Sequence, residues 1–404
     1  MSGNSEIGKH RGSPGADLPR GFRAAGVAAG LKATGAADMA LLVSDSPAAV
    51  AALFTTNQVK SATVQLGMDR LRGRVARAVV INSGNANACT GARGLRDARA
   101  MARQTAERLA VSESTVFVCS TGTIGRYLPM DTIRSGIDAL VPRLSPEGGT
   151  EASEAILTTD TRPKRWTVTL KVGRKSVRVT GFCKGAGMIE PNMATMLAFL
   201  VTDAAVPAAA LQRLLKTAAD RSFNRITVDG DRSTNDTVLF FANGQSGAPS
   251  LRPGKPGWAA FERAVLEITH QLAMAIVRDG EGATRFITIR VRGARSDRDA
   301  DLAGRSVANS LLVKTAWAGK NANWGRVMDA LGYSAARVRP ESVSIRFDHL
   351  QAVRGGQPGS ATREDLQTIL AKPEFTVDID LHLGRGSAVV YTCNCTEEYV
   401  RINV

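Results

Sequence analysis

The chain has 404 residues, 44% of them hydrophobic, which is enough for about two or three domains with sizeable cores. Its formal net charge is +15, and residues 1–194 hold most of the excess, with 26 Lys and Arg against 15 Asp and Glu. These basic residues lie mostly at helical spacing among alanines, as on a solvated helix face, and no nucleic-acid-binding motif accompanies them. The composition therefore disfavours nucleic acid as the main partner and remains compatible with a small anionic substrate.

The apolar runs and the cysteines indicate where in the cell the protein acts and whether it binds a metal. No apolar run reaches the roughly 18 residues of a membrane span, and the first 24 residues are polar and rich in Gly and Pro, unlike a signal peptide. A cytoplasmic protein is therefore expected, and five scattered cysteines predict reduced thiols. Cys393 and Cys395 lack a second Cys or His pair at ligand spacing, so we expect no metal.

The first half of the chain alternates strands and helices. Strands are predicted at 76–84, 115–120, 165–172, 176–182 and 196–203, with helices at 92–110 and 130–144. The short segment 172–176 between two alternating runs predicts a hairpin, and therefore antiparallel pairing.

The second half continues in the same manner. Helices are predicted at 207–223, 258–280 and 304–318, and strands at 236–244, 284–293, 342–348, 375–383, 387–393 and 398–403. Hairpins mixed with helices favour an α+β fold, with sheets covered by helices, over one doubly wound sheet.

Several catalytic signatures are absent from the sequence. P-loop, nucleophile-elbow, zincin and dinucleotide motifs do not occur, and the four histidines are too scattered to support a triad. The stretch "DGDRSTND" (229–236) imitates a calcium loop, but Thr234 and Phe240 occupy its glycine and glutamate positions. We interpret it as a polar turn.

Nucleophilic catalysis without histidine needs another base. A threonine whose own α-amino group, with a pKa of about 7.7 to 8.0, accepts the hydroxyl proton meets this need. The glycine-rich stretch "GAGMIEPNMATML" (185–197) offers such a threonine at the Ala194–Thr195 bond, if the hydroxyl attacks the preceding carbonyl and the resulting ester hydrolyses.

An acyl-transfer site also needs donors for the oxyanion. The stretch "CSTGTIGRYLP" (119–129) leaves a strand and enters a polar turn. There Gly122 allows a backbone N–H to approach a substrate, and Thr121 adds a hydroxyl. A plain turn remains the alternative for this stretch.

Taken together, these stretches resemble the ornithine acetyltransferase family, the glutamate N-acetyltransferases of arginine biosynthesis. The resemblance runs from about residue 20 to 403. It is carried by strings such as "VVINSGNANACTG" (79–91), "STGTIG" (120–125), "TTDTRPK" (158–164), "KGAGMIEPNMATML" (184–197), "DGEGATRF" (279–286) and "EEYVRIN" (397–403).

The resemblance implies a proenzyme that cuts itself between Ala194 and Thr195. Residues 1–194 and 195–404 would then be an α and a β chain, which stay together as a heterotetramer of two α and two β chains. Its fold would be an αββα-like layered sandwich with mixed sheets, similar to N-terminal nucleophile hydrolases but with its own connectivity.

The resemblance also assigns an activity and its residues. Acetyl would pass from N2-acetylornithine to glutamate by a ping-pong exchange through an acetyl ester of Thr195, with no bound cofactor. Acetyl-CoA stays open as a further donor. The oxyanion donors would be Thr121 and Gly122, and the substrate-binding residues would be Thr158, Lys184, Thr195, Glu281 and Asn403.

Three alternatives remain open. The chain could be a self-processing N-terminal threonine amidohydrolase that passes the acyl group to water. Family members usually continue beyond the "RIN" string to a terminal Ser or Thr, whereas this sequence ends at Val404. A catalytically impaired homologue is therefore the second alternative. A basic scaffold or nucleic-acid binder is the third.

Overall fold

The computed structural model describes residues 11–190 and 196–404, which divide into two compact units. Among the described residues, unit 1 comprises 11–185, 196–224 and 232–273, and unit 2 comprises 186–190, 225–231 and 274–404. Unit 1 contains residues from both sides of the Ala194–Thr195 bond. The predicted α and β chains are thus a different division of the sequence, and that division stays a prediction.

Unit 1 combines one large mixed sheet with six helices among its described residues, the last of which, α6, continues into unit 2. The strands are β1 (Arg11–Ser13), β2 (Phe22–Val27), β3 (Met39–Phe54), β4 (Val75–Asn85), β5 (Val116–Thr123), β6 (Lys164–Val172), β7 (Lys175–Lys184), β8 (Leu197–Thr202) and β9 (Thr237–Ala242). The helices are α1 (Ala62–Arg70), α2 (Gly91–Leu109), α3 (Met130–Leu140), α4 (Gly149–Ala155), α5 (Ala208–Arg221) and α6 (Trp258–Arg278).

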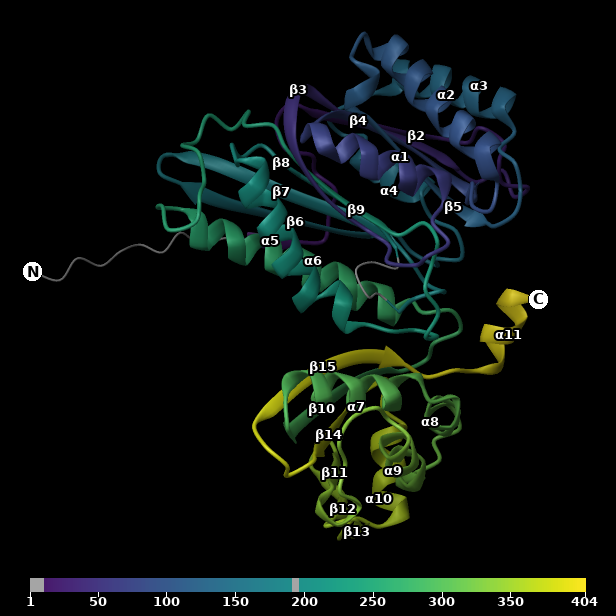
Figure 1. Ribbon diagram of the computed structural model, residues 1–404, viewed down its shortest axis with the longest axis vertical. Coiled ribbons are helices and arrows are strands. Elements are labelled where there is room, and N and C mark those ends of the chain that lie inside the picture. Colours follow the sequence, from purple (N-terminus) through teal and green to yellow (C-terminus); the bar gives the residue numbers. More distant parts are fainter. Residues whose placement is uncertain (1–10, 191–195) are drawn as a thin grey trace, which may run out of the picture. The chain divides into compact units, whose positions relative to one another are not determined.

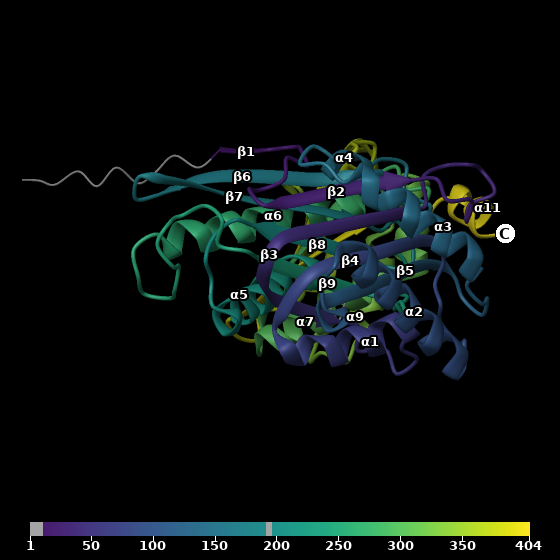
Figure 2. The same ribbon diagram turned by 90° about the horizontal axis from the view of Figure 1, so that it is seen from above.

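The long strand β3 joins two layers of strands. It pairs with β2 and β4 at its start and with β9 at its end, with a register shift between Val43 and Ala48 (Figure 2). Phe117 of β5 and Phe241 of β9 lie with ring centroids 6.1 Å apart, although β3 and β4 separate their strands in the sheet. The two halves of the sheet therefore pack face to face around one apolar core.

Helices cover both outer faces of these layers (Figure 1). Alternate residues of β2, β3 and β4 point outward to a second core that α1, α2 and α3 complete. On the opposite side, Phe261 of α6 stacks on Phe240 of β9 at 6.4 Å, and Gly181 of β7 leaves room for Leu272. The α+β class and the αββα-like layering with mixed sheets are confirmed.

Unit 2 is built around a smaller mixed sheet, in the order β13-β12-β11-β14-β10-β15. Its strands are β10 (Phe286–Ala294), β11 (Ser344–Phe347), β12 (Leu350–Arg354), β13 (Gln357–Pro358), β14 (Glu374–Asp380) and β15 (Gly386–Cys393). Its helices are α7 (Asp297–Asn309), α8 (Leu311–Ala318), α9 (Trp324–Gly332), α10 (Arg363–Leu370) and α11 (Glu397–Asn403). A core that includes Trp317 against Phe375 at 5.9 Å joins the sheet and the helices.

Two element predictions in unit 2 are wrong. The helix predicted at 304–318 is two helices, because Ser310 leaves the helical conformation and its side chain caps α8 by accepting from the Val313 amide. The strand predicted at 398–403 is helix α11, which begins after Thr396 with two acidic residues in its first turn. The predicted hairpin of β6 and β7 is antiparallel, as expected.

Two expectations about the whole chain concern the cysteines and the membrane. All five cysteines are free thiols, as predicted. Among the described residues, no helix is both long and apolar enough to cross a bilayer.

Candidate active site

Thr121 and Gly122 lie at the end of β5, beside the end of β4. Gly122 pairs with Gly84, and a Cβ on Gly122 would lie 2.3 Å from the Gly84 carbonyl carbon. The φ of Gly122 is +129°, in the region that glycine favours. The sequence therefore needs glycine here for both reasons: Gly122 still belongs to β5, and the turn follows at 124–125.

Lys184, the last residue of β7, brings a positive charge to this turn. Its side chain is buried, with 8% of its surface exposed, and its Nζ lies 3.5 Å from Thr121 Oγ1. Among the described residues, no carboxylate lies within 4.0 Å of the Lys184 ammonium. A buried cation without a close counterion is suited to binding an anionic group.

Asp160 organises the loop that Thr158 belongs to. Its fully buried side chain accepts from Lys164 Nζ at 2.6 Å, from the Gly185 amide at 2.6 Å and from the Thr158 amide at 3.1 Å. Because Gly185 follows Lys184, this carboxylate links Thr158 to the lysine. The structure thus brings four predicted site residues of unit 1 together: Thr121, Gly122, Thr158 and Lys184.

The charges around Asp160 keep it ionised. Burial alone would raise the pKa of this carboxyl, but the ammonium groups of Lys184 and Lys164 outweigh it and hold the pKa well below its usual range. Lys32 is a further cation near Asp160. Burial lowers the pKa of its ammonium, and the charges of Asp38 and Asp160 oppose this shift.

Asp236, just before β9, is a second buried carboxyl of unit 1, and it behaves in the opposite way. Burial raises its pKa well above the usual value, although hydrogen bonding to Ser233 and the charge of Lys184 oppose this shift. Burial thus favours the protonated form of this carboxyl more than that of an exposed aspartate. The backbone of Met196, the residue before β8, donates a hydrogen bond to Asp236.

Glu281 and Asn403 form the part of the predicted site that belongs to unit 2. Asn403 Nδ2 donates to Glu281 Oε2 at 2.7 Å, and Glu281 is buried, with 7% of its surface exposed. The carboxyl group packs on Gly187, where a Cβ would lie 2.4 Å from it. No cation lies within 4.0 Å of this carboxylate in the described part of the chain, so it is suited to binding a substrate ammonium.

The predicted nucleophile, Thr195, and its neighbour Ala194 lie outside the described residues. Sequence reasoning missed Asp160, Lys164 and Asp236 as parts of the site, although all three lie within the strings that carry the family resemblance or border them. An acid and a lysine four residues apart in "DTRPK" were a signal for the buried Asp160–Lys164 ion pair.

The stretch 229–236 is a polar turn, as predicted. The Asp231 amide donates to Asp229 Oδ1, and the Asn235 amide donates to Ser233 Oγ. No cluster of three potential metal ligands occurs within residues 11–190 and 196–404.

The αββα layering, with a polar strand end and a buried lysine beside it, is the arrangement expected of an enzyme that transfers acyl groups. Comparisons with known proteins specify it further: the chain belongs to the ArgJ family, whose sequence model matches residues 23–404. It is accordingly an acyltransferase of arginine biosynthesis, and the predicted family is confirmed.

One reported relative covers nearly the whole chain, and two solved chains cover about half of it. The arginine biosynthesis bifunctional protein ArgJ of Geobacter sulfurreducens is 52% identical, over 95% of this chain and 98% of that protein. A crystal structure of the ArgJ protein of Bacillus halodurans is 39% identical, with a TM-score of 0.50, and covers 52% of this chain and 99% of that one. An ornithine acetyltransferase of Mycobacterium tuberculosis, solved in complex with ornithine, is 43% identical over 46% of this chain and all of that one, with a TM-score of 0.44.

Proposed function

We propose that this chain moves an acetyl group from N2-acetylornithine to glutamate through an acetyl ester of Thr195. The Thr195 hydroxyl attacks the acetyl carbonyl while its proton passes to the α-amino group of the same residue. The C–N bond then breaks, and the proton leaves with the amine of ornithine. The amino group of glutamate attacks the ester, and the threonine oxygen recovers a proton.

The Thr121 and Gly122 pair supports the step in which negative charge develops. The Gly122 amide and the Thr121 hydroxyl are the donors proposed for the oxyanion of the tetrahedral intermediate. Because Lys184 Nζ approaches Thr121 Oγ1 as a donor at 3.5 Å, the hydroxyl hydrogen is free to point to the substrate. The positive charge nearby favours the same intermediate.

Two buried groups without a close ion partner support the choice of substrate, and they are the observation that carries this proposal. In unit 1, Lys184 is proposed to bind the α-carboxylate that acetylornithine and glutamate share, with Thr158 in the adjoining loop. In unit 2, Glu281 is proposed to bind the ammonium of ornithine, held by Asn403. A relative in this family was solved with ornithine bound.

We propose that the nucleophile is released by self-cleavage between Ala194 and Thr195. The solved chain from Bacillus halodurans supports this. The match includes 99% of that solved chain but only 52% of this one, so the solved chain is about half as long. Residues 195–404 make up the same fraction, 210 of 404. The two products would assemble as two α and two β chains in the cytoplasm.

We also propose acetyl-CoA as a second acetyl donor, because the curated relatives carry the name bifunctional. The enzyme would then form acetylglutamate from acetyl-CoA and glutamate when acetylornithine is absent. No bound cofactor is part of the proposed reaction.

An assay with purified protein tests the proposal. Acetylornithine with glutamate should yield equimolar ornithine and acetylglutamate. Acetylornithine alone should release ornithine only up to one equivalent of enzyme. Continuous release of ornithine and acetate without glutamate would show an amidohydrolase instead, and no release at all would show an impaired homologue.

A further inference from the structure

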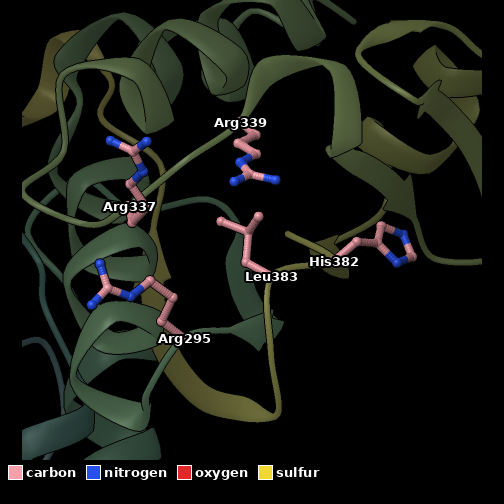
Figure 3. A pocket seen from close by; sticks show the side chains of 5 residues that line it. All are labelled: Arg295, Arg337, Arg339, His382 and Leu383. Atoms are coloured by element: carbon pink, nitrogen blue, oxygen red, sulfur yellow. The ribbon is translucent and has the colours of Figure 1, made fainter.

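Unit 2 carries a cavity of about 380 Å³ that the proposed reaction does not use. Its lining residues are Arg295, Arg337, Arg339, His382 and Leu383, and Figure 3 shows the three arginine side chains arranged around Leu383. The volume lies within the range of about 300 to 1,000 Å³ that small-molecule sites occupy.

The topology of the sheet gathers these residues at one edge. Strands β10 and β14 are parallel, so their carboxyl ends lie at the same edge, where Arg295 follows β10 and His382 follows β14. Strand β11 runs antiparallel to β14 and therefore begins there, directly after the segment with Arg337 and Arg339. The carboxyl ends of parallel strands are a frequent place for ligands in mixed α and β folds.

The three guanidinium groups of the cavity lack acidic partners. Within the part of the chain that the structure describes, no carboxylate lies within 4.0 Å of Arg295, Arg337 or Arg339. The neighbouring arginines of β10 differ, since Arg292 binds Asp380 at 2.8 Å and Arg290 lies 3.8 Å from Asp378. Three like charges around one cavity repel one another, and a bound anion relieves that repulsion.

The backbone around His382 is fixed in an uncommon conformation. His382 has a φ of +51°, a value that residues other than glycine adopt rarely and mostly where the surroundings hold them. Amides on both sides of it are bound to β10, Leu381 to the Arg292 carbonyl at 3.0 Å and Leu383 to the Gly293 carbonyl at 2.6 Å. Gly293 permits this approach, because a Cβ there would lie 2.8 Å from the His382 nitrogen.

We propose that this cavity is a binding site for a small anion that carries phosphate groups, of the size of a diphosphate or the diphosphate part of a nucleotide. The planar guanidinium group forms paired hydrogen bonds with phosphate oxygens, and three of them match the charge of a diphosphate better than that of one carboxylate. A second cavity of about 400 Å³ shares His382, and its lining includes Arg346 and Arg354 together with the carboxylates Asp378 and Asp380. It therefore gives room for an uncharged part of a larger ligand rather than for more phosphate.

Calorimetric titration of the purified full-length protein with pyrophosphate, at fixed ionic strength, tests this site. We expect saturable binding, and in the double variant Arg337→Gln/Arg339→Gln an affinity about tenfold or more lower, since each residue loses charged hydrogen bonds. The matched control is Arg252→Gln/Arg363→Gln. It removes two exposed arginines outside the cavity and should bind as the wild type does.

Titrations with inorganic phosphate and with coenzyme A distinguish the source of the phosphate. If coenzyme A binds more tightly than pyrophosphate, and the double variant loses this binding, the ligand is a nucleotide. Binding that is no tighter than that of inorganic phosphate identifies free phosphate. Two results with pyrophosphate overturn the proposal: no saturable binding, or a loss of affinity in the control variant equal to that in the double variant. Tighter binding of a single-stranded oligonucleotide than of all three small anions also overturns it. None of these outcomes depends on acetyl transfer.

Discussion

Lys184 is the residue on which substrate binding depends most directly. Its ammonium is buried and makes no contact ion pair, so the charge of Asp160 offsets only part of the cost of burial, and a substrate carboxylate would supply a direct partner. In Lys184→Met, which keeps an apolar stem, we expect kcat/KM for acetylornithine to fall by about tenfold to a hundredfold. Steady-state kinetics measure this. Lys216→Met, which removes an exposed lysine of α5, is the control, and unchanged kinetics of Lys184→Met would contradict the assignment.

Thr121 should act in the transition state more than in substrate binding. Thr121→Val keeps the shape of the side chain and removes its hydroxyl, so we expect kcat to fall by roughly a hundredfold with little change in KM. Thr123→Val, at an exposed position of the same strand end, is the matched variant and should behave as the wild type. Equal effects of the two substitutions would argue against an oxyanion role.

Asp160 links the site to the stability of the fold. In Asp160→Asn the buried ion pair with Lys164 is lost, and we expect the free energy of unfolding at neutral pH to fall by about 3 to 5 kcal/mol. Asp45→Asn, which breaks the exposed Arg23–Asp45 pair, should cost at most about 1 kcal/mol.

The difference between wild type and Asp160→Asn should depend on pH in a defined direction. Because the folded pKa of Asp160 lies below the unfolded value of about 3.9, its carboxylate stabilises the fold above that value. This stabilisation is lost as the pH falls through the folded pKa. Thermal melts should therefore show the largest gap near pH 7 and a narrowing gap below about pH 4; a constant gap would speak against an ionised Asp160.

At the scale of elements, helix α11 positions Asn403 against Glu281. In Asn403→Ala the carboxylate loses the donor at 2.7 Å, and we expect the KM for acetylornithine to rise about tenfold. Val400→Ala, at an exposed position of the same helix, should leave the KM unchanged. A rise in both variants would indicate that the helix as a whole, and not the Asn403 side chain, is responsible.

Strands with strong alternation and helices with strong periodicity could be predicted, and weaker or capped elements could not. Strand β7 and helix α2 are found where the patterns placed them. Helix α11 was mistaken for a strand, because "EYVRIN" alternates over too few residues to outweigh its acidic first turn. Strand β3 was missed, because alanines and a central "SDSP" interrupt its apolar pattern, although it joins the two layers of unit 1.

The motifs of the site could be predicted from the sequence, but the contacts and the burial of their side chains could not. Thr121 and Lys184 are 63 positions apart, and only the fold brings their side chains to 3.5 Å. The family resemblance supplied that pairing, since neither residue type nor spacing reveals a contact between strands that are distant in sequence. Burial is equally invisible in the sequence, so the opposite directions in which the pKa values of Asp160 and Asp236 shift could be seen only in the structure.

At the scale of the whole molecule, the proposed chemistry and the proposed processing share one residue. Thr195 is the N-terminus that cleavage would create and the nucleophile that would carry the acetyl group. Thr195→Ala should therefore remain a single uncut chain and lack acetyl transfer, while it melts as a folded protein. A cleaved or active Thr195→Ala would remove the link between the two events.

Intact-mass spectrometry of the wild-type protein tests that link most directly. After brief incubation with acetylornithine, we predict two fragments that separate before Thr195. The fragment that begins with Thr195 should be heavier by one acetyl group, which is lost when glutamate is added. A single uncut chain, or a cleaved fragment that never gains an acetyl group, would contradict the account.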